Sequence, residues 1–319
     1  MLFSEDLVVS AATEEIAGEL RIYGNLSLLE MAPVLLAADR IYSGKTVVEH
    51  GGVMSLWGKT TDLPSLAAAG QSDIAANSDI QALRCSFENP DLRFIFTLAE
   101  CPYRIVCRRS AGITRLADLR GKRIGTMFKS SAEYFLDRML RTVGMTEHDV
   151  TIVPFMAKTE APLTLMPQAL LAKDLDAVTV WEPQMQRASI AIGPDAIEFI
   201  DPSVYRERFN LCSTQAKLAD AATRHKIIAF VRSLVVATER LRLTPQEGWQ
   251  LVAHAAQLDV QTVKDAWPYL TYPGTLAADL LDVLIPADVW VAKETGRAPR
   301  TRGQLSEFVD ASVVREALT

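Results

Sequence analysis

The sequence predicts an α/β fold in two domains, each built on a mainly parallel sheet, followed by a set of helices. Its 319 residues are too many for one comfortable hydrophobic core and suit two domains of ordinary size. Strand-like and helix-like segments alternate twice along the chain, which is the pattern of βαβ units. Pro102 stands between the two alternations, and helical periodicity dominates after residue 223.

The first alternation begins at residue 20. It predicts strands at 20–24, 46–49 and 73–76 and helices at 32–41, 54–69 and 79–85. Pro33 falls in the first turn of its helix, where the missing N–H costs little. This spacing indicates parallel strands with helices on both faces of the sheet.

The second alternation follows a crossing between domains. Two β-rich segments, 92–98 and 103–107, flank Pro102, and proline cannot donate to a strand ladder, so we expect the chain to change domains here. Further strands are predicted at 122–126, 150–155, 177–181 and 196–200, with helices at 131–143 and 165–173. With 209–213 as the return crossing, domain I comprises 20–102 and 213–319, and domain II comprises 103–212.

The last third of the chain is predicted to be helical, at 223–243, 245–257, 260–267 and 276–295. Apolar residues recur there at helical spacing, as at Ile227, Phe230, Val231 and Leu234. We expect these helices to pack onto the two domains, since the amphipathic segment 276–281 has one apolar face.

Polar clusters follow three of the predicted strands. They are Asn25, Ser27 and Glu30; Asn77, Ser78 and Gln81; and Ser130, Ser131 and Glu133. Each contains Ser-x-x-Glu or Ser-x-x-Gln, the capping-box pattern that begins a helix. A helix N-terminus beyond the carboxyl end of a strand offers free N–H donors, so these three starts predict binding of a small anion.

Composition excludes some function classes. The net charge of −6 and the pI near 5.4 argue against a nucleic-acid or anionic-membrane surface, which needs excess Lys and Arg. The segment at Met1 lacks a basic stretch followed by a long apolar run, and no stretch has the length of a membrane span. The protein is therefore expected outside the cytoplasm if a leader was removed, and in the cytoplasm otherwise.

Neither a metal nor a cofactor is predicted. The four cysteines, Cys85, Cys101, Cys107 and Cys212, form no CxxC pair and have no histidine at ligand spacing. We expect them to be mostly buried thiols.

Two motifs carry a resemblance to a known family. Residues 113–125, ITRLADLRGKRIG, resemble the "dLkGKrIg" entry to the second domain, and residues 175–183, LDAVTVWEP, resemble the "vDAv..WEP" strand and turn. The glycine turn at Gly51 and Gly52 and the segment 73–78 also match. Over residues 20–243 the chain is similar to the type II periplasmic substrate-binding proteins of ABC transporters for nitrate, sulfonate, taurine and thiamine pyrimidines.

The resemblance implies that loops after the strands line a ligand cleft between the domains. The positions carried over as ligand-binding are Asn25, Ser27, Gly52, Asn77, Ser78, Ser130, Ser131, Trp181 and Glu182. His50 is added to them from the sequence itself, because it ends a predicted strand beside the cleft. Asn and Ser side chains would add donors for anion oxygens, and Trp181 could stack on a ligand ring. His50 could act as a cationic donor or a general base, because imidazole titrates near neutrality.

The leading hypothesis is a receptor that captures a small anionic organic molecule, a sulfonate, carboxylate or related anion, and delivers it as a monomer to an ABC permease and ATPase. The alternative is an intracellular enzyme on the same fold, similar to the desulfinases or pyrimidine synthases, with His50 in the cleft and Cys101 or Glu100 as partner. Pyrimidines and nitrate-like ions remain open as ligands at this point.

Overall fold

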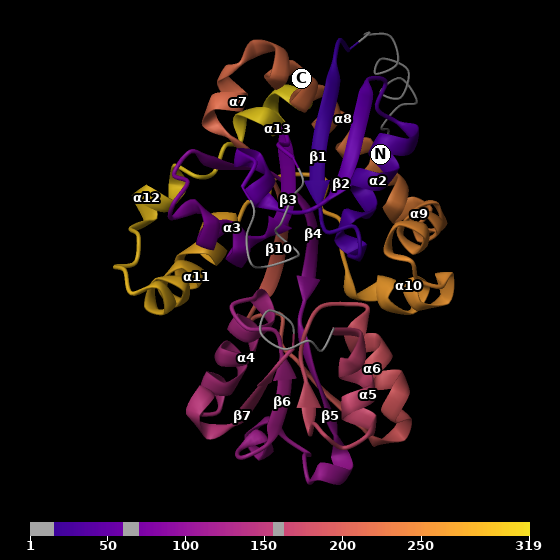
Figure 1. Cartoon of the computed structure of the whole chain (residues 1–319), viewed down its shortest axis with the longest axis vertical. Coiled ribbons are helices and arrows are strands. Elements are labelled where there is room, and N and C mark those ends of the chain that lie inside the picture. Colours follow the sequence, from indigo (N-terminus) through magenta and orange to yellow (C-terminus); the bar gives the residue numbers. More distant parts are fainter. Residues whose placement is uncertain (1–15, 60–69, 156–162) are drawn as a thin grey trace, which may run out of the picture.

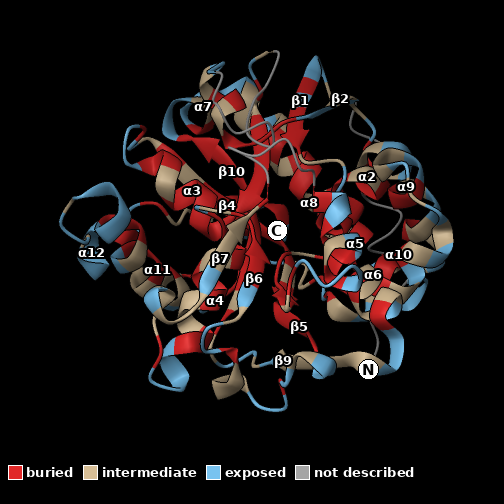
Figure 2. Cartoon of the chain, turned by 60° about the horizontal axis from the view of Figure 1, so that its bottom comes forward, coloured by how far each residue is buried: buried red, intermediate tan, exposed pale blue. Residues whose placement is uncertain are grey.

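A computed structural model describes residues 16–59, 70–155 and 163–319 of the chain. Figure 1 shows two lobes, one above the other, and each is built on its own five-stranded sheet with helices around it. The strands at the centre of both sheets are largely buried, whereas the helices present exposed outer faces (Figure 2). No helix in the described ranges combines the length and apolar character needed to cross a bilayer.

The sheet of the first lobe has the order β2-β1-β3-β10-β4. Its strands are β1 (Glu19–Gly24), β2 (Lys45–His50), β3 (Ile74–Ser78), β4 (Leu92–Pro102) and β10 (Arg206–Thr214). β1 pairs in parallel with β2 and β3, as the sequence predicted, whereas β10 runs antiparallel to β3 and β4.

The sheet of the second lobe has the order β7-β6-β8-β5-β9. Its strands are β5 (Arg104–Arg108), β6 (Arg123–Thr126), β7 (Thr151–Pro154), β8 (Ala177–Val178) and β9 (Ala196–Ile200), and its helices are α4 (Ser131–Thr142), α5 (Met166–Leu171) and α6 (Gln184–Ile192). β6 pairs in parallel with β7 and β8. This parallel core matches the second predicted alternation.

Helices cover the first lobe. They are α2 (Ala32–Arg40), α3 (Asp79–Ser86), α7 (Gln215–Ala219), α8 (Ala221–Leu243), α9 (Gln246–Ala256), α10 (Val260–Ala266), α11 (Leu280–Thr295), α12 (Arg302–Ser306) and α13 (Ser312–Ala317). The helix predicted at 54–69 is instead a short 3₁₀ helix, η3 (Val53–Trp57), which ends at Gly58 in the left-handed conformation; residues 60–69 lie outside the described ranges.

The chain passes from the first sheet to the second at Tyr103, between β4 and β5. It returns before Arg206, because β10 pairs with β4 along its whole length, from Arg206 opposite Pro102 to Thr214 opposite Leu92. Residues 206–212 were expected from the sequence in the inserted domain, but they belong to β10, a strand of the first sheet. We therefore propose 103–205 as the inserted segment.

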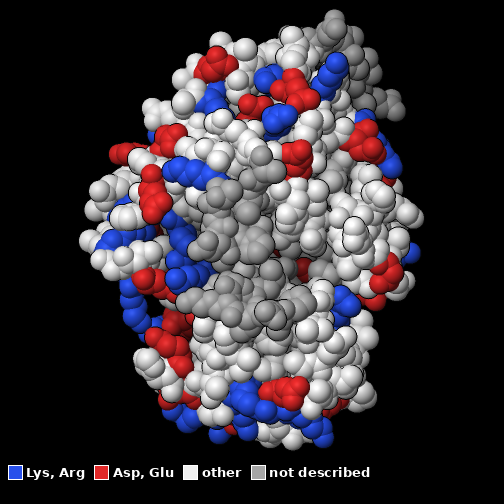
Figure 3. Space-filling model, viewed as in Figure 1, with Lys and Arg blue, Asp and Glu red and all other residues white. Residues whose placement is uncertain are grey.

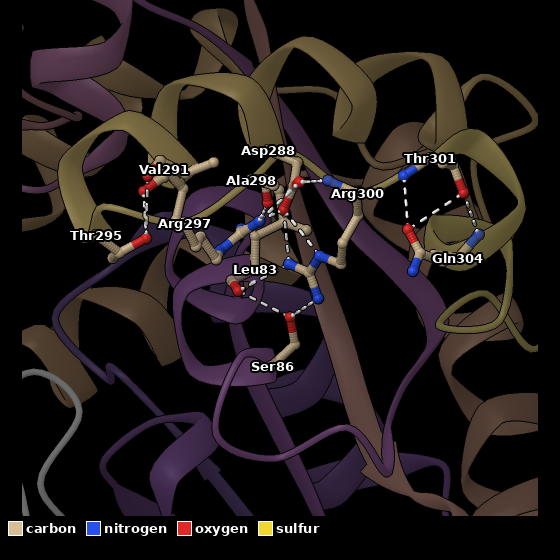
Figure 4. Close-up of polar contacts among 11 residues, drawn as sticks. Leu83, Ser86, Asp288, Val291, Thr295, Arg297, Ala298, Arg300, Thr301 and Gln304 are labelled. Atoms are coloured by element: carbon tan, nitrogen blue, oxygen red, sulfur yellow. Dashed lines mark hydrogen bonds and ion pairs between the residues drawn. The ribbon is translucent and has the colours of Figure 1, made fainter.

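A buried carboxylate fixes the C-terminal helices to α3 (Figure 4). Asp288 of α11 is fully buried and accepts hydrogen bonds from Arg297 and Arg300, and Arg300 also donates to Ser86 and to the Leu83 carbonyl of α3. Burial alone would raise the pKa of Asp288, but the hydrogen bonds from the two arginines hold that pKa below its usual range. The C-terminal half of α3 is thereby tied to α11 through Arg300.

Arg104 links the lobes from inside. Its side chain is 1% exposed and contacts Glu182 at 2.8 Å and Glu198 at 2.8 Å within the second lobe. It also donates to the hydroxyl of Tyr269, in the 3₁₀ helix η9 (Trp267–Tyr269) that follows α10, at 2.8 Å. The buried charge is therefore fully compensated, and it ties β5 to the helices of the first lobe.

The variant Arg104→Met should lower the free energy of unfolding by about 3–5 kcal/mol, because it leaves Glu182 buried without a counter-charge. The double variant Arg104→Met/Glu182→Gln should recover part of this loss. Urea unfolding followed by circular dichroism measures both.

Arg141→Met serves as the matched control, because Arg141 is 49% exposed and its ion pair with Asp137 is worth less than about 1 kcal/mol. Equal losses at positions 104 and 141 would contradict this assignment.

Candidate functional site

A cavity between the two lobes is the candidate site. The first lobe contributes side chains from the ends of β1 and β3, from η2 (Leu29–Met31), from α3 and from β10, and the second lobe contributes the segments after β6 and β8. The lining residues are Asn25, Leu28, Glu30, Asn77, Ser78, Gln81, Tyr103, Met127, Ser130, Ser131, Trp181, Glu207 and Phe209. Residues from both sheets therefore face one shared space.

Two of the three predicted helix starts meet at this cavity. Ser78 is the N-cap of α3, where its Oγ accepts from the Gln81 N–H at 3.3 Å, and Ser130 is the N-cap of α4, where its Oγ accepts from the Ala132 N–H at 3.2 Å. Both caps follow the carboxyl ends of parallel strands, where α/β sheets place their ligands.

The third helix start differs from the prediction. Ser27 is exposed and caps no helix, because Leu28 occupies the N-cap of η2 and the Asn25 side chain accepts from the Ser27 N–H at 3.1 Å. The turn directs Ser27 outward and Glu30 inward. Glu30 was predicted to belong to a capping box, but its side chain is buried, with 1% of the residue exposed. Ser27 does not line the cavity.

The other predicted positions divide into two groups. Asn25, Asn77, Ser78, Ser130, Ser131 and Trp181 line the cavity. His50 and Gly52 do not line it. β2 is an edge strand, one strand further from the lobe junction than β1; His50, its last residue, is exposed, and Gly52 is the N-cap of η3. Glu182 lies in a smaller adjoining cavity, bound to Arg104, so it is an ion-pair partner in this structure.

The charged residues of the described cavity lining are two glutamates. Glu30 and Glu207 are 1% and 3% exposed, and the Tyr103 hydroxyl donates to Glu207 Oε2 at 2.6 Å. Among the residues that the structure describes, no Lys or Arg lines this cavity. Glu207 was not predicted as a site residue, because 209–213 was interpreted as a connection between domains. Had this segment been interpreted as a strand, alternation would have placed Glu207 on the face of the sheet opposite to Arg206 and Arg208.

The protein's own carboxylates already lie at the two helix starts. Asp79 accepts from the Ile80 N–H at 2.7 Å, at the start of α3, and from the Tyr205 hydroxyl at 2.6 Å. At the start of α4, Glu207 accepts a hydrogen bond from the Ser131 side chain. The positive helix ends are therefore offset by Asp79 and Glu207 before any ligand enters.

Burial shifts the protonation of these acids. It raises the pKa of Glu30 to about 7 and that of Asp79 to about 6. Burial, together with the nearby Asp79 and Glu30, raises the pKa of Glu207 well above its usual range. The site can thus hold protons or a positive group near neutral pH.

All four cysteines are free and buried, as the sequence predicted. Cys101 lines the smaller cavity, and its Sγ donates to Glu30 Oε1 at 3.5 Å. Burial, reinforced by Glu30 and Glu207, raises the pKa of the Cys101 thiol well above its ordinary value. A thiol held in this form is a poor nucleophile, and exposed His50 does not activate it.

The lobes also meet at the Lys129 carbonyl. Gln81 Nε2 donates to this oxygen at 2.9 Å and Arg84 donates to it at 3.3 Å, so α3 of the first lobe contacts the loop before α4 of the second. Gln81 Oε1 is buried without a hydrogen-bond partner in the cavity lining. It is an acceptor available to a ligand that donates.

The comparisons with known proteins place this chain in a family. A family model described as "NMT1/THI5 like" matches residues 57–247, more than half of the chain. The chain belongs to the NMT1/THI5-like family. This confirms the resemblance found in the two sequence motifs.

Relatives agree on the fold. A Haemophilus influenzae protein whose name assigns it to thiamine biosynthesis is 26% identical over 215 residues. The match covers 65% of this chain and 66% of the relative, so this chain spans slightly less than two thirds of the relative's length. The alkanesulfonate-binding protein SsuA from Xanthomonas axonopodis, bound to MOPS, is 17% identical with a TM-score of 0.67 over 92% of this chain and 98% of its own. The desulfurization enzyme DSZB is 14% identical with a TM-score of 0.63 over 94% and 98%. The two-domain type II periplasmic binding-protein fold is therefore confirmed.

The variant Glu133→Gln should make the protein more stable at pH 8 and leave it unchanged near pH 4. Glu133 accepts from the Lys129 N–H at the lobe junction, and burial raises its pKa from 4.5 to about 7. The folded chain keeps a proton that the unfolded chain releases, so wild-type stability falls as pH rises from 4.5 to 7. Glutamine removes this loss, on the order of 1–3 kcal/mol, in urea unfolding.

The matched control is Glu239→Gln, at a half-exposed position on α8. It should show no gain that depends on pH. The same dependence of stability on pH in both variants would contradict a raised pKa of Glu133.

Proposed function

We propose that the protein is a solute-binding receptor that captures a small organic molecule between its lobes for import by an ABC transporter. The cavity carries this proposal, because its lining comes from both lobes and a bound solute would bridge them. Two-lobed binding proteins close around their ligand by a hinge motion, so that binding changes the conformation of the whole protein. Family membership and the fold support the proposal, as does the presence of binding proteins among the structural relatives.

The ligand we propose presents hydrogen-bond donors, or a positive charge, on an aromatic ring. Glu207 and Gln81 Oε1 offer acceptors, and Trp181 offers an apolar face. A free anion would meet buried carboxylates with no cation in the described lining, and a desolvated like charge is costly. The sequence favoured an anion because helix starts follow from a local pattern, whereas the burial of the acids beside them does not.

An aminopyrimidine satisfies these requirements. Its exocyclic amine donates and its ring can stack on Trp181. The Haemophilus influenzae relative named for thiamine biosynthesis supports a thiamine-type pyrimidine as the first solute to test. Delivery to a permease and an extracytoplasmic location belong to the same proposal. The catalytic alternative has no support from His50 or Cys101. These two residues do not line a common cavity, and they do not form an activated pair.

Isothermal titration calorimetry should show saturable one-to-one binding of 4-amino-5-hydroxymethyl-2-methylpyrimidine and none of ethanesulfonate or nitrate. The reverse ranking would overturn the proposed ligand class. Unfolding and refolding the protein before the titration removes any retained solute. If the refolded protein binds none of the three compounds, the proposed ligand is wrong.

Trp181→Leu should weaken binding of the pyrimidine about tenfold, because ring stacking contributes roughly 0.5–1.5 kcal/mol beyond burial. The control Trp249→Leu alters a tryptophan of α9 that stacks on Lys264 away from the cavity, and it should leave the affinity unchanged. Calorimetry is preferred to fluorescence here, since both variants remove a fluorophore.

A further inference from the structure

Three potential metal ligands converge beside the cavity. Cys101 of β4 and Glu207 of β10 are opposite each other in the strand register, and Glu30 of η2 reaches the same point. One ligand atom from each, the Cys101 Sγ and a carboxylate oxygen of each glutamate, lies within 4.8 Å of the other two. All three side chains are more than 90% buried.

A second observation indicates that this cluster lacks an occupant. Glu30 Oε2 is buried and has no hydrogen-bond partner, and Glu30 lines both the main cavity and the smaller one. Arg104, which also lines the smaller cavity, already contacts Glu182, Glu198 and Tyr269. Two buried carboxylates without an available cation therefore face one space, which is costly unless protons or a cation offset them.

We propose that Glu30, Cys101 and Glu207 bind a divalent metal ion of the zinc type. Thiolate and carboxylate donors suit Zn²⁺, whereas Ca²⁺ and Mg²⁺ take oxygen ligands alone. The hydrogen bond from Tyr103 to Glu207 at 2.6 Å orients the carboxylate as outer partners of metal ligands do. Glu30 and Glu207 both line the main cavity, so a fourth ligand, water or a solute atom, would come from that side.

Metal binding displaces protons from all three ligands. On binding, the Cys101 thiol and the protonated carboxyl groups of Glu30 and Glu207 release their protons to solvent; Cys101 forms an S–Zn bond, and the two carboxylates each supply an oxygen. Two carboxylates, one thiolate and one Zn²⁺ carry a net charge of −1, so the site still favours solutes that donate hydrogen bonds. The sequence predicted no metal because the three residues come from segments far apart in the chain, with no ligand spacing to recognise.

Chelator-treated full-length protein without a histidine tag tests the site. Titration with Zn²⁺ against a chromophoric chelator should show one equivalent bound, with affinity about 100-fold or more lower in Glu30→Gln and Cys101→Ser. The control Cys85→Ser, which changes a buried thiol of α3 outside the cluster, should bind as the wild type does. Co²⁺ should give a thiolate charge-transfer band in the wild type and in Cys85→Ser, and none in Cys101→Ser.

Absence of stoichiometric binding, or equal affinity in all four proteins as expected for exposed histidines, would overturn the metal site. Circular dichroism verifies that each variant is folded, and Glu30→Gln provides the test if Cys101→Ser does not fold. Solute titrations on the metal-free protein decide the proposed receptor function separately, because loss of zinc binding with retained solute binding refutes only the metal site.

Discussion

Burial of carboxylates where the two lobes meet is the constraint on which the site depends. Glu30, Asp79 and Glu207 come from three separate elements and lie at or beside the cavity with almost no solvent exposure. Each is satisfied in part by neighbours, as Asp79 is by Tyr205 and Glu207 by Tyr103. The remaining acceptor capacity faces the cavity, and it selects occupants that bring protons or positive charge.

The surrounding structure holds this arrangement in place. β4 and β10 pair along their full lengths, so Cys101 and Glu207 have a fixed register next to the crossing. Asp288 fixes α11 to α3, and Arg104 ties β5 to Tyr269 across the junction. On the outer face shown in Figure 3, acidic and basic residues are interspersed, whereas the charged residues of the described cavity lining, Glu30 and Glu207, are both acidic.

Much of the fold was predictable from the sequence, because alternation of strands and helices and the capping pattern are local signals. Ser78 and Ser130 cap α3 and α4 as their Ser-x-x-Gln and Ser-x-x-Glu patterns predict. The prediction of an N-cap at Ser27 is wrong, because the same pattern there lies in a turn, and the 3₁₀ helix η2 that comes after this turn has Leu28 as its N-cap. The acids were missed for a different reason: the burial of Glu207 depends on the pairing of strands more than 100 residues apart, which no local pattern reveals. Likewise, His50 follows a predicted strand as expected, but only the strand order shows that this strand is at the edge.

The central claim, that buried acids select the ligand, is tested most directly by identifying what the protein retains. The purified protein can be exposed to a small-molecule extract, washed and denatured, and the released compound identified by mass spectrometry. The account predicts a nitrogen heterocycle or amine with N–H donors, in one-to-one ratio with the protein. An alkanesulfonate, a carboxylate without a donor group, or nitrate at that ratio would contradict it.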